Sequence, residues 1–302
     1  MSARLLSCLV PAVLALTSMA ACSEPAAPPA EEAEPVAGPE TIAEAPAAPT
    51  LQQLWIAEGF EAPEGAAMAP DGNYFISSIR GEGTDKDGDG YVSKLSPDGE
   101  LIEQYFAAKL NAPKGMVVRN GTLYVADIDQ VVMFNAETGS RIGGVRVPEA
   151  GFLNDMTVWG NKVLVSDSAT ASIIDVSSGE PVVWLQDEEN LAGVNGLLGD
   201  GNRLLVATMA SGSLYSVSEA GELTEIASGM ENADGIGLVP GGGYMLSSWP
   251  GQIHYVSEDG TVTTLVDTTE EGILQNDLTE FGDIVLSPNW EPGTVTAWKV
   301  VR

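Results

Sequence analysis

Six polar residues recur along the chain with side chains that could together bind one hard metal ion. They are separated by 50, 40, 41, 39 and 42 residues, and each leads into an apolar segment: Glu64, Lys114, Asn154, Asn195, Asp234 and Asn276. Carboxylate and amide oxygens are the donors that Ca²⁺, Mg²⁺ and Mn²⁺ prefer, and carboxylates also bind Zn²⁺. If the fold brings these anchor positions together, they form a divalent metal site, for which calcium is the best match. The alternative is that each residue only starts a strand, because asparagine and aspartate favour turns.

A metal ion at this place would support hydrolysis, because it polarises a carbonyl group and lowers the pKa of water. Asp234 or Glu64 is then expected to accept the proton of the water, and Lys114 to stabilise the oxyanion or bind a substrate carboxylate. Lys114 could instead neutralise the acidic ring in place of a metal. His254 is the single histidine and stands within an apolar segment, so the base must be a carboxylate.

A second acidic cluster lies in an insertion at residues 81–91. Asp85, Asp87 and Asp89 occupy positions 1, 3 and 5 of a calcium-binding loop, and Gly90 occupies position 6. The glutamate usual at position 12 is missing, so we predict a structural calcium site of modest affinity, with a solvated acidic turn as the alternative. We expect the insertion to rim the active site, with Arg80 contacting substrate.

The elements that must position these residues are short strands. Each anchor position is followed by a turn and an alternating second strand, at 122–126, 162–166, 203–207 and 243–246. Third strands follow at 131–135, 172–176, 213–217 and 252–256. Four short strands about every 40 residues are typical of propeller blades. The pattern predicts an all-β, six-bladed β-propeller with four-stranded blades over residues 51–302.

The sixth repeat indicates how the ring closes. It supplies strands near 278–281, 283–287 and 294–300, after which the chain ends, so its fourth strand must come from the N-terminal segment 52–57. This pairing removes the exposed edges of an open sheet. It also places the six anchor positions at the same face of the central channel.

Four of the anchor motifs resemble those of a known family: Pro63-Glu64-Gly65, Leu153-Asn154-Asp155, Val194-Asn195-Gly196-Leu197 and Ala233-Asp234-Gly235-Ile236. They are similar to motifs of the senescence-marker-protein, gluconolactonase and luciferin-regenerating-enzyme propellers, and the resemblance extends over essentially all of 51–302. It implies a divalent metal held by Glu64, Asn195 and Asp234, with Asn154 as a further ligand or a substrate contact. The family's substrate-contacting arginine is replaced by Phe152, which argues against a sugar-acid lactone as substrate.

The N-terminal segment predicts export and a lipid anchor. Residues 1–21 read as a signal peptide, and the sequence Ala20-Ala21-Cys22 resembles a lipobox, which makes Cys22 the lipidated residue. A signal peptide without lipidation is the alternative. Residues 22–50 are rich in alanine, proline and glutamate and predict a disordered tether. We expect a periplasm-facing protein, with the outer membrane favoured by Ser23.

The charge of the chain limits its partners. Residues 51–302 contain 37 of the 43 acidic residues and 12 of the 13 basic residues, so their formal net charge is close to −25. Such a surface repels nucleic acid and anionic lipid headgroups. We therefore expect a monomer that meets the membrane only through its lipid anchor.

Two functions fit these features. The first is an extracytoplasmic, metal-dependent hydrolase acting on a small lactone or ester. The second is a non-catalytic propeller of the NHL type that binds a peptide, glycan or partner protein on its top face, because propellers host many unrelated activities.

Overall fold

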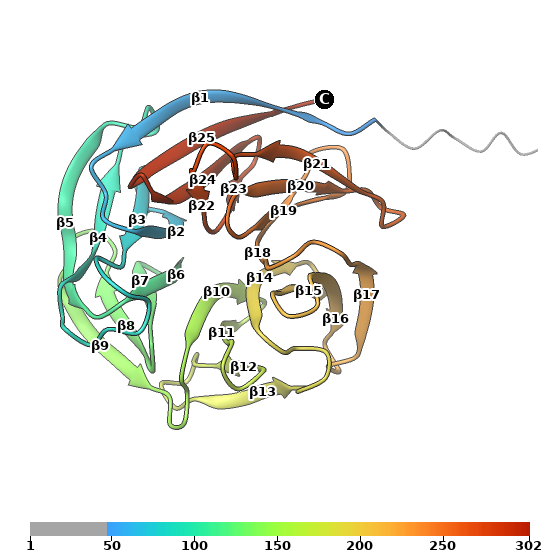
Figure 1. The fold of residues 1–302 in the computed structure, drawn as a ribbon. Coiled ribbons are helices and arrows are strands. Elements are labelled where there is room, and N and C mark those ends of the chain that lie inside the picture. Colours follow the sequence, from blue (N-terminus) through green and yellow to red (C-terminus); the bar gives the residue numbers. More distant parts are fainter. Residues whose placement is uncertain (1–46) are drawn as a thin grey trace, which may run out of the picture. The chain divides into compact units, whose positions relative to one another are not determined.

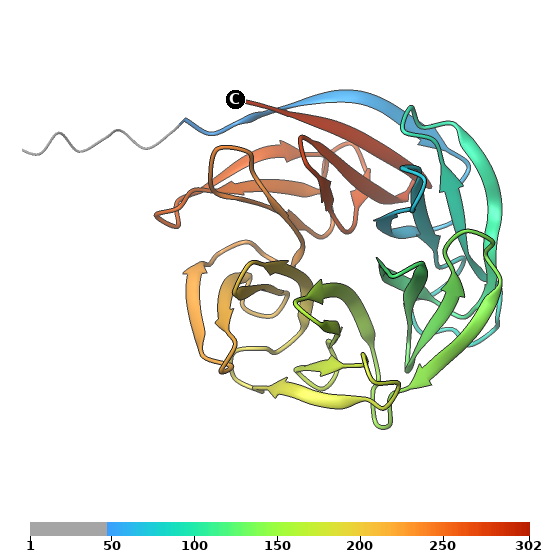
Figure 2. The ribbon, with the colours of Figure 1, turned by 180° about the vertical axis from the view of Figure 1, so that it is seen from behind.

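The computed structural model describes residues 47–302, which form a ring of six antiparallel sheets. The sheets follow one another in chain order around a central axis (Figure 1), and the ring is equally clear from behind (Figure 2). The described residues contain no helix, and so none that is long and apolar enough to cross a membrane. The predicted all-β, six-bladed propeller is confirmed. The predicted signal peptide, Cys22 and most of the predicted tether lie outside the described residues.

Blades 1 to 3 each contain four consecutive strands, given from the channel outwards. Blade 1 comprises β2 (Pro63–Met68), β3 (Tyr74–Ser78), β4 (Gly90–Leu95) and β5 (Leu101–Leu110). Blade 2 comprises β6 (Pro113–Arg119), β7 (Thr122–Asp127), β8 (Gln130–Asn135) and β9 (Arg141–Arg146). Blade 3 comprises β10 (Leu153–Trp159), β11 (Lys162–Asp167), β12 (Ser172–Asp175) and β13 (Val182–Gln186).

Blades 4 and 5 repeat this order, and blade 6 combines both ends of the propeller chain. Blade 4 comprises β14 (Val194–Asp200), β15 (Arg203–Thr208), β16 (Ser213–Ser218) and β17 (Leu223–Ala227). Blade 5 comprises β18 (Ala233–Leu238), β19 (Tyr244–Ser248), β20 (Gln252–Val256) and β21 (Val262–Asp267). Blade 6 comprises β22 (Leu274–Gln275), β23 (Thr279–Phe281), β24 (Ile284–Glu291), β25 (Thr294–Val301) and β1 (Thr50–Glu58).

The N-terminal strand closes the ring as predicted. β1 pairs antiparallel with β25, from Thr50 opposite Val301 to Glu58 opposite Thr294. In Figure 1 the blue β1 lies along the dark red β25 at the outer edge of blade 6. The last strand, β25, therefore has a hydrogen-bonded neighbour on both sides, and β1 forms the outer edge of blade 6.

The innermost strand of blade 6 differs from the prediction. The predicted strand at 278–281 corresponds to β23, and the short strand β22 precedes it as a separate piece; both pair with β24. Between them, the amide of Leu278 donates to Oδ1 of Asp277 at 2.7 Å. This local bond satisfies the Leu278 amide where the ladder is interrupted.

The hydrophobic core consists of separate clusters between neighbouring blades. One example joins blades 1 and 2, where Phe75 stacks on Phe106 with ring centroids 4.7 Å apart and packs beside Leu123 and Phe134. Comparable clusters lie at the other five blade interfaces. Because the blades are held together by side chains, their inner edges are free to present polar groups to the channel.

Candidate active site

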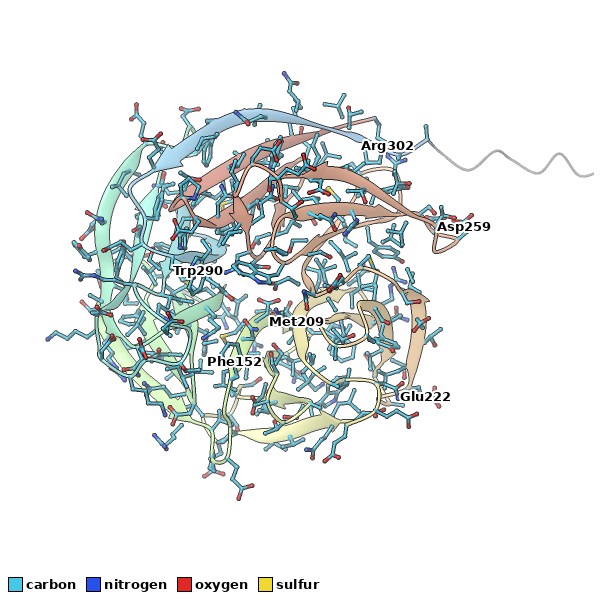
Figure 3. All side chains as sticks on the ribbon, viewed as in Figure 1. Phe152, Met209, Glu222, Asp259, Trp290 and Arg302 are labelled. Carbon is cyan, nitrogen blue, oxygen red and sulfur yellow. The ribbon has the colours of Figure 1, made fainter. Side chains whose placement is uncertain are left out.

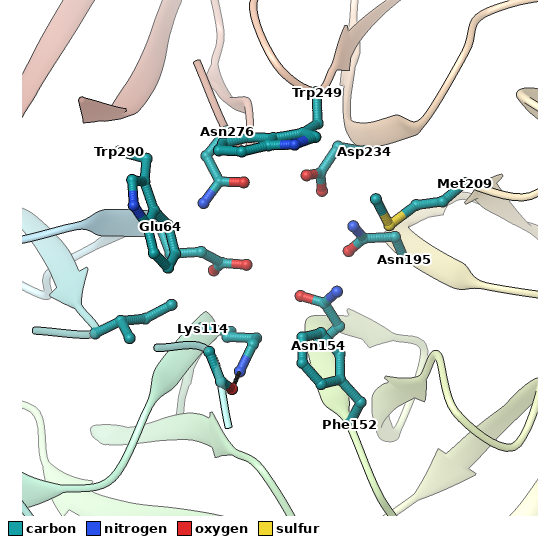
Figure 4. Close-up of a pocket in the computed structure, with 12 residues that line it drawn as sticks. Glu64, Lys114, Phe152, Asn154, Asn195, Met209, Asp234, Trp249, Asn276 and Trp290 are labelled. Atoms are coloured by element: carbon teal, nitrogen blue, oxygen red, sulfur yellow. Dashed lines mark hydrogen bonds between the residues drawn. The ribbon is translucent and has the colours of Figure 1, made fainter. Parts of the chain in front are cut away.

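All six anchor positions line one cavity of about 200 Å³ on the channel axis. Five of them stand on the innermost strands β2, β6, β10, β14 and β18, and Asn276 stands between β22 and β23. Figure 4 shows that the side chains of five of them point toward a common centre, whereas the ammonium group of Lys114 turns toward the carbonyl of Gly83. Ring closure thus makes neighbours of residues that span 212 positions in sequence.

An irregularity in each innermost strand presents the anchor side chain to the channel. Pairing of β2 with β3 is interrupted between Pro63 and Ala66, and the same interruption occurs in β6, β10, β14 and β18. In blade 1 the amide that is freed, that of Gly65, donates to Oγ of Ser77 at 2.8 Å. Equivalent serines accept the corresponding amide in blades 3 and 5. In these three blades the amide at the bulge is satisfied locally and is not left as an unpaired donor.

Four of the anchors are followed by a glycine, and close packing between neighbouring strands explains why. A Cβ atom on Gly196 would lie 2.1 Å from the carbonyl oxygen of Asp234 in the next blade. A Cβ atom on Gly65 would lie 3.0 Å from the carbonyl oxygen of Lys114, which is also a tight contact. Neighbouring innermost strands approach so closely that a larger residue does not fit without displacement.

Three buried oxygen atoms in this cavity have no hydrogen-bond partner: Oε2 of Glu64, Oδ1 of Asn154 and Oδ1 of Asn195. The orientation of Asn154 is set by its amide nitrogen, which donates to Oγ of Ser168 at 3.3 Å. Ser168 in turn donates to the carbonyl of Val194 at 2.6 Å. Buried oxygens without partners are costly, and a cation is the group that would satisfy several of them together.

The charged groups of the cavity are all shifted toward their neutral forms. Burial raises the pKa of Glu64 well above its ordinary value, and the nearby Asp277 and Asp234 raise it further. Burial also raises the pKa of Asp234, with added repulsion from Asp277 and Asp155. Burial lowers the pKa of Lys114, although neighbouring carboxylates oppose that shift. A bound cation would relieve the repulsion among these carboxylates.

Two further carboxylates, Asp155 and Asp277, belong to the same channel and were not singled out from the sequence. Each follows an anchor at the position where the other four blades have glycine. This replacement of glycine by aspartate is the sequence feature that could have identified them. Both line a second cavity, which also contains Glu280. Burial raises the pKa of Asp155 well above its ordinary value and that of Asp277 to about 6.

The ammonium group of Lys114 is engaged by contacts within the protein. Its ammonium group donates to the carbonyl of Gly83 at 2.8 Å and to that of Ala112 at 3.1 Å. It also lies 4.3 Å from the ring centroid of Phe152. Through the bond to Gly83, Lys114 holds the β3–β4 loop against the cavity.

The insertion lies between β3 and β4, as predicted, and reaches the cavity through Gly83. Arg80 does not line the cavity, because its guanidinium faces Glu61 and Asp89, with Nε–carboxylate distances of 3.3 and 3.7 Å. The role of Arg80 as a substrate contact therefore gains no support from its position.

The three aspartates of the insertion do not converge in this structure. Oδ2 of Asp85 accepts the amide of Glu82, and Oδ1 of Asp87 accepts the amide of Asp89. Within residues 47–302, no group of three or more histidine, cysteine, aspartate or glutamate side chains is arranged to hold a metal ion. Calcium binding by Asp85, Asp87 and Asp89 stays a prediction, and a metal at the channel centre would need the amide oxygens as well.

A second set of positions recurs 14 or 15 residues after the anchors. The repeat that identifies the anchors could therefore have identified these positions too. These wall positions are Ile79, Ile128, Ser168, Met209, Trp249 and Trp290. Four of them, together with Phe152, form the apolar wall of the cavity. Figure 3 shows Phe152, Met209 and Trp290 toward the centre of the ring, whereas Glu222 and Asp259 lie at its periphery.

Comparison with known proteins identifies the fold. No family model and no curated protein sequence matches this chain. Among solved structures, streptogramin B lyase has a TM-score of 0.61 at 13% identity, covering 83% of this chain and 98% of its own.

Two further solved structures are similar to this chain in fold, again at low sequence identity. A catalytically inactive histidine-to-alanine variant of virginiamycin B lyase from Staphylococcus aureus, with quinupristin, has a TM-score of 0.59 at 14% identity, covering 84% of this chain and 100% of its own. A structural-genomics target described as a candidate gluconolactonase has a TM-score of 0.61 at 17% identity, covering 85% and 94%. The TM-scores show a shared six-bladed propeller fold, and at identities this low they show the fold alone.

Proposed function

We propose that this protein is an extracytoplasmic, lipid-anchored, metal-dependent hydrolase of the lactonase or esterase type. The observation that carries the proposal is the set of three buried, unpartnered oxygen atoms of Glu64, Asn154 and Asn195 in one cavity with the carboxylate of Asp234. The gluconolactonase-like neighbour supports the same class of reaction by its fold. The lipobox-like sequence ending at Cys22 supports export and anchoring.

The ligand set favours a hard divalent cation. Glu64, Asn154, Asn195 and Asp234 offer only oxygen donors, which suit calcium better than zinc, and no histidine or cysteine lines the cavity. When bound, such an ion would polarise a carbonyl group and acidify a nearby water.

The residues of the cavity can carry out the proton transfers of ester hydrolysis. Asp234 is the proposed base, with Glu64 as the alternative, because both carboxylates line the cavity and could accept a proton from a water molecule there. The water oxygen bonds to the carbonyl carbon while its proton passes to the carboxylate. The carbon–oxygen bond to the leaving group then breaks, and the alkoxide takes a proton, which yields an acid and an alcohol.

A lyase reaction of the kind named for two of the structural neighbours is less well supported here. In one of them, replacement of a histidine by alanine gives an inactive enzyme. The single histidine of this chain, His254, lies on β20 in the interior of blade 5, where its Nδ1 is 3.1 Å from Oγ1 of Thr264. It does not line the cavity.

The experiment that tests the proposal is metal analysis of the purified protein, followed by a panel of lactones and esters. We expect one divalent ion in the channel per molecule, loss of that ion in Glu64→Gln, and hydrolysis that chelation abolishes and calcium restores. If the protein contains no such ion and hydrolyses no member of the panel, the hydrolase proposal fails. A non-catalytic binding propeller, in which Lys114 neutralises the acidic ring, would then be the better account.

A further inference from the structure

We infer that the substrate is an uncharged lactone or ester with an apolar body, and not a sugar-acid lactone. This inference rests on the proposed hydrolase function and concerns the same cavity. It is carried by the wall positions, which lie beyond the anchor positions and recur with the same repeat.

The wall presents large apolar side chains to the opening of the cavity. The indoles of Trp249 and Trp290 pack edge to face, with centroids 6.1 Å apart and planes at 76°, and join blades 5 and 6 in one surface. Trp290 also packs against the buried cluster that contains Ile79 and Ile128. Phe152 and Met209 lie on other sides of the same opening (Figure 4).

These residues are only partly buried, whereas the anchor positions beneath them are almost fully buried. In a chain with a formal net charge of −30, large apolar groups gathered around one opening indicate a binding surface. The polar anchors and the apolar wall thus divide the cavity into a reactive centre and a nonpolar rim.

The charges of the cavity disfavour an anionic substrate. Lys114 is the only cation among the described residues that line it, and two backbone carbonyls and the Phe152 ring already engage its ammonium group. Arg80 is held outside by Glu61 and Asp89. A carboxylate or phosphate on the substrate would therefore find no free cationic side chain, and Glu64 and Asp234 would already balance the two charges of a bound divalent cation.

The wall also offers few partners for sugar hydroxyls. Apart from the six anchor positions, the residues around this cavity are Gly83 and largely apolar side chains, among which the indole N–H groups of Trp249 and Trp290 are the strong donors. A polyol that entered would lose water and gain few hydrogen bonds at the rim, which is unfavourable. An alkyl or aryl group, in contrast, gains from every methylene that it buries there.

A series of γ-lactones that differ only in the length of the alkyl chain tests the inference. From γ-butyrolactone to γ-decalactone we expect kcat/KM to rise about fourfold for each methylene that enters the cavity. D-Glucono-1,5-lactone should be hydrolysed at least about tenfold less efficiently than γ-decalactone. Equal efficiency across the series, or a preference for the gluconolactone, would overturn the inference while leaving the hydrolase proposal intact.

Substitutions assign the preference to the wall. Trp290→Ala should lower the ratio of kcat/KM for γ-decalactone to that for γ-butyrolactone by about tenfold, and Trp290→Phe should retain most of it. Tyr105→Ala is the matched control, because Tyr105 is an exposed aromatic residue on β5 and lies outside the cavity. An unchanged ratio in a folded Trp290→Ala protein contradicts the inference.

Binding of lactams separates this inference from the reaction itself, because an amide analogue resists hydrolysis. Calorimetric titration should show tighter binding of 5-hexyl-2-pyrrolidinone than of 2-pyrrolidinone, and Trp290→Ala should remove the difference. That result supports an apolar site even if no lactone is hydrolysed, in which case only the proposed function fails. Equal affinity of the two lactams overturns the inference whatever the activity.

Discussion

Asp234 has the position expected of a general base, because its carboxylate is buried and lines the cavity. Asp234→Asn keeps the shape of the side chain but removes its charge and its capacity to accept a proton. We expect kcat/KM for the best lactone to fall by about 10² or more, with the thermal unfolding midpoint retained or raised. Steady-state kinetics and calorimetry measure the two effects.

Asn276 provides the control for this substitution. It lines the same cavity, but it is not among the proposed ligands and is not a proton acceptor. Asn276→Ala should therefore reduce kcat/KM less than Asp234→Asn does. If Asp234→Asn leaves a confirmed hydrolase activity unchanged, the assignment of Asp234 is wrong.

Asp277 predicts a pH-dependent stability of the metal-free protein. Burial raises its pKa from 3.8 to about 6, so the folded state binds a proton that the unfolded state releases between these values. The stabilisation by this group is complete below about pH 4 and is lost as the pH rises through about 6. At pH 8 the ionised carboxyl then costs on the order of 3 kcal/mol, which Asp277→Asn should recover.

Urea unfolding at pH 4, 6 and 8, with chelator present, measures this difference. Asparagine can still accept the amide of Leu278 through its Oδ1, so the local hydrogen bond is kept. We expect the two proteins to have similar stability at pH 4 and to diverge as the pH rises. Parallel curves over the whole range would show that the folded-state pKa of Asp277 is not raised.

At the scale of the element, the β3–β4 loop crowds three aspartates into five residues. Oδ1 of Asp89 is buried without a hydrogen-bond partner, and calcium binding would supply one. Calcium should therefore raise the unfolding midpoint of the wild type, and Asp87→Ala should abolish the part of the response that comes from this loop. Differential scanning calorimetry with calcium or with chelator measures the response.

Asp98→Ala is the control for the loop, because Asp98 is an exposed aspartate in the neighbouring β4–β5 turn. It should leave the calcium response of the wild type intact. Since the channel site is expected to bind calcium too, the comparison is repeated in Glu64→Gln. If Asp87→Ala does not change the calcium response in this background, the loop does not bind calcium. It is then a solvated acidic turn.

At the scale of the whole molecule, β1 joins the two ends of the ring. The indole nitrogen of Trp55 donates to the carbonyl of Pro97 at 3.0 Å, and its ring packs on Gly99 in the β4–β5 turn. Trp55 therefore connects blade 6 to blade 1 as well as standing in the strand that closes the ring. Trp55→Ala should lower the free energy of unfolding by about 3 kcal/mol.

Leu54→Ala tests whether this cost is specific to the closure. Leu54 is the preceding residue on β1 and is 44% exposed, so its truncation should change the free energy of unfolding by less than about 0.5 kcal/mol. Urea titration followed by circular dichroism measures both proteins. Equal losses in the two variants would mean that Trp55 has no special part in ring closure.

Membrane attachment also belongs to the whole molecule, and it depends on residues outside the described range. Cys22→Ala removes the thiol that lipidation requires, so the protein should remain unprocessed or appear in the soluble fraction. Cell fractionation with immunoblotting measures the distribution. Equal recovery of wild type and variant with the membranes would refute lipidation at Cys22.

The sequence by itself determined the propeller and the convergence of the anchor positions. Both follow from local patterns, because alternating strands and turn residues define each blade and a spacing of about 40 residues makes the blades equivalent. Closure by the N-terminal strand followed from the missing strand of the last repeat. Equivalent positions in a closed ring must meet on the axis, so Glu64 and Asp234 could be brought together without any coordinates.

Only the tertiary structure decided what each side chain contacts at the axis. Lys114 donates to Gly83 and Ala112, and Arg80 turns toward Glu61 and Asp89, because their partners come from loops whose paths the repeat does not specify. The unpartnered oxygens and the aromatic wall likewise depend on packing between different blades. Repeat spacing places backbones, whereas hydrogen bonding and burial at a site are set by neighbours that are distant in sequence.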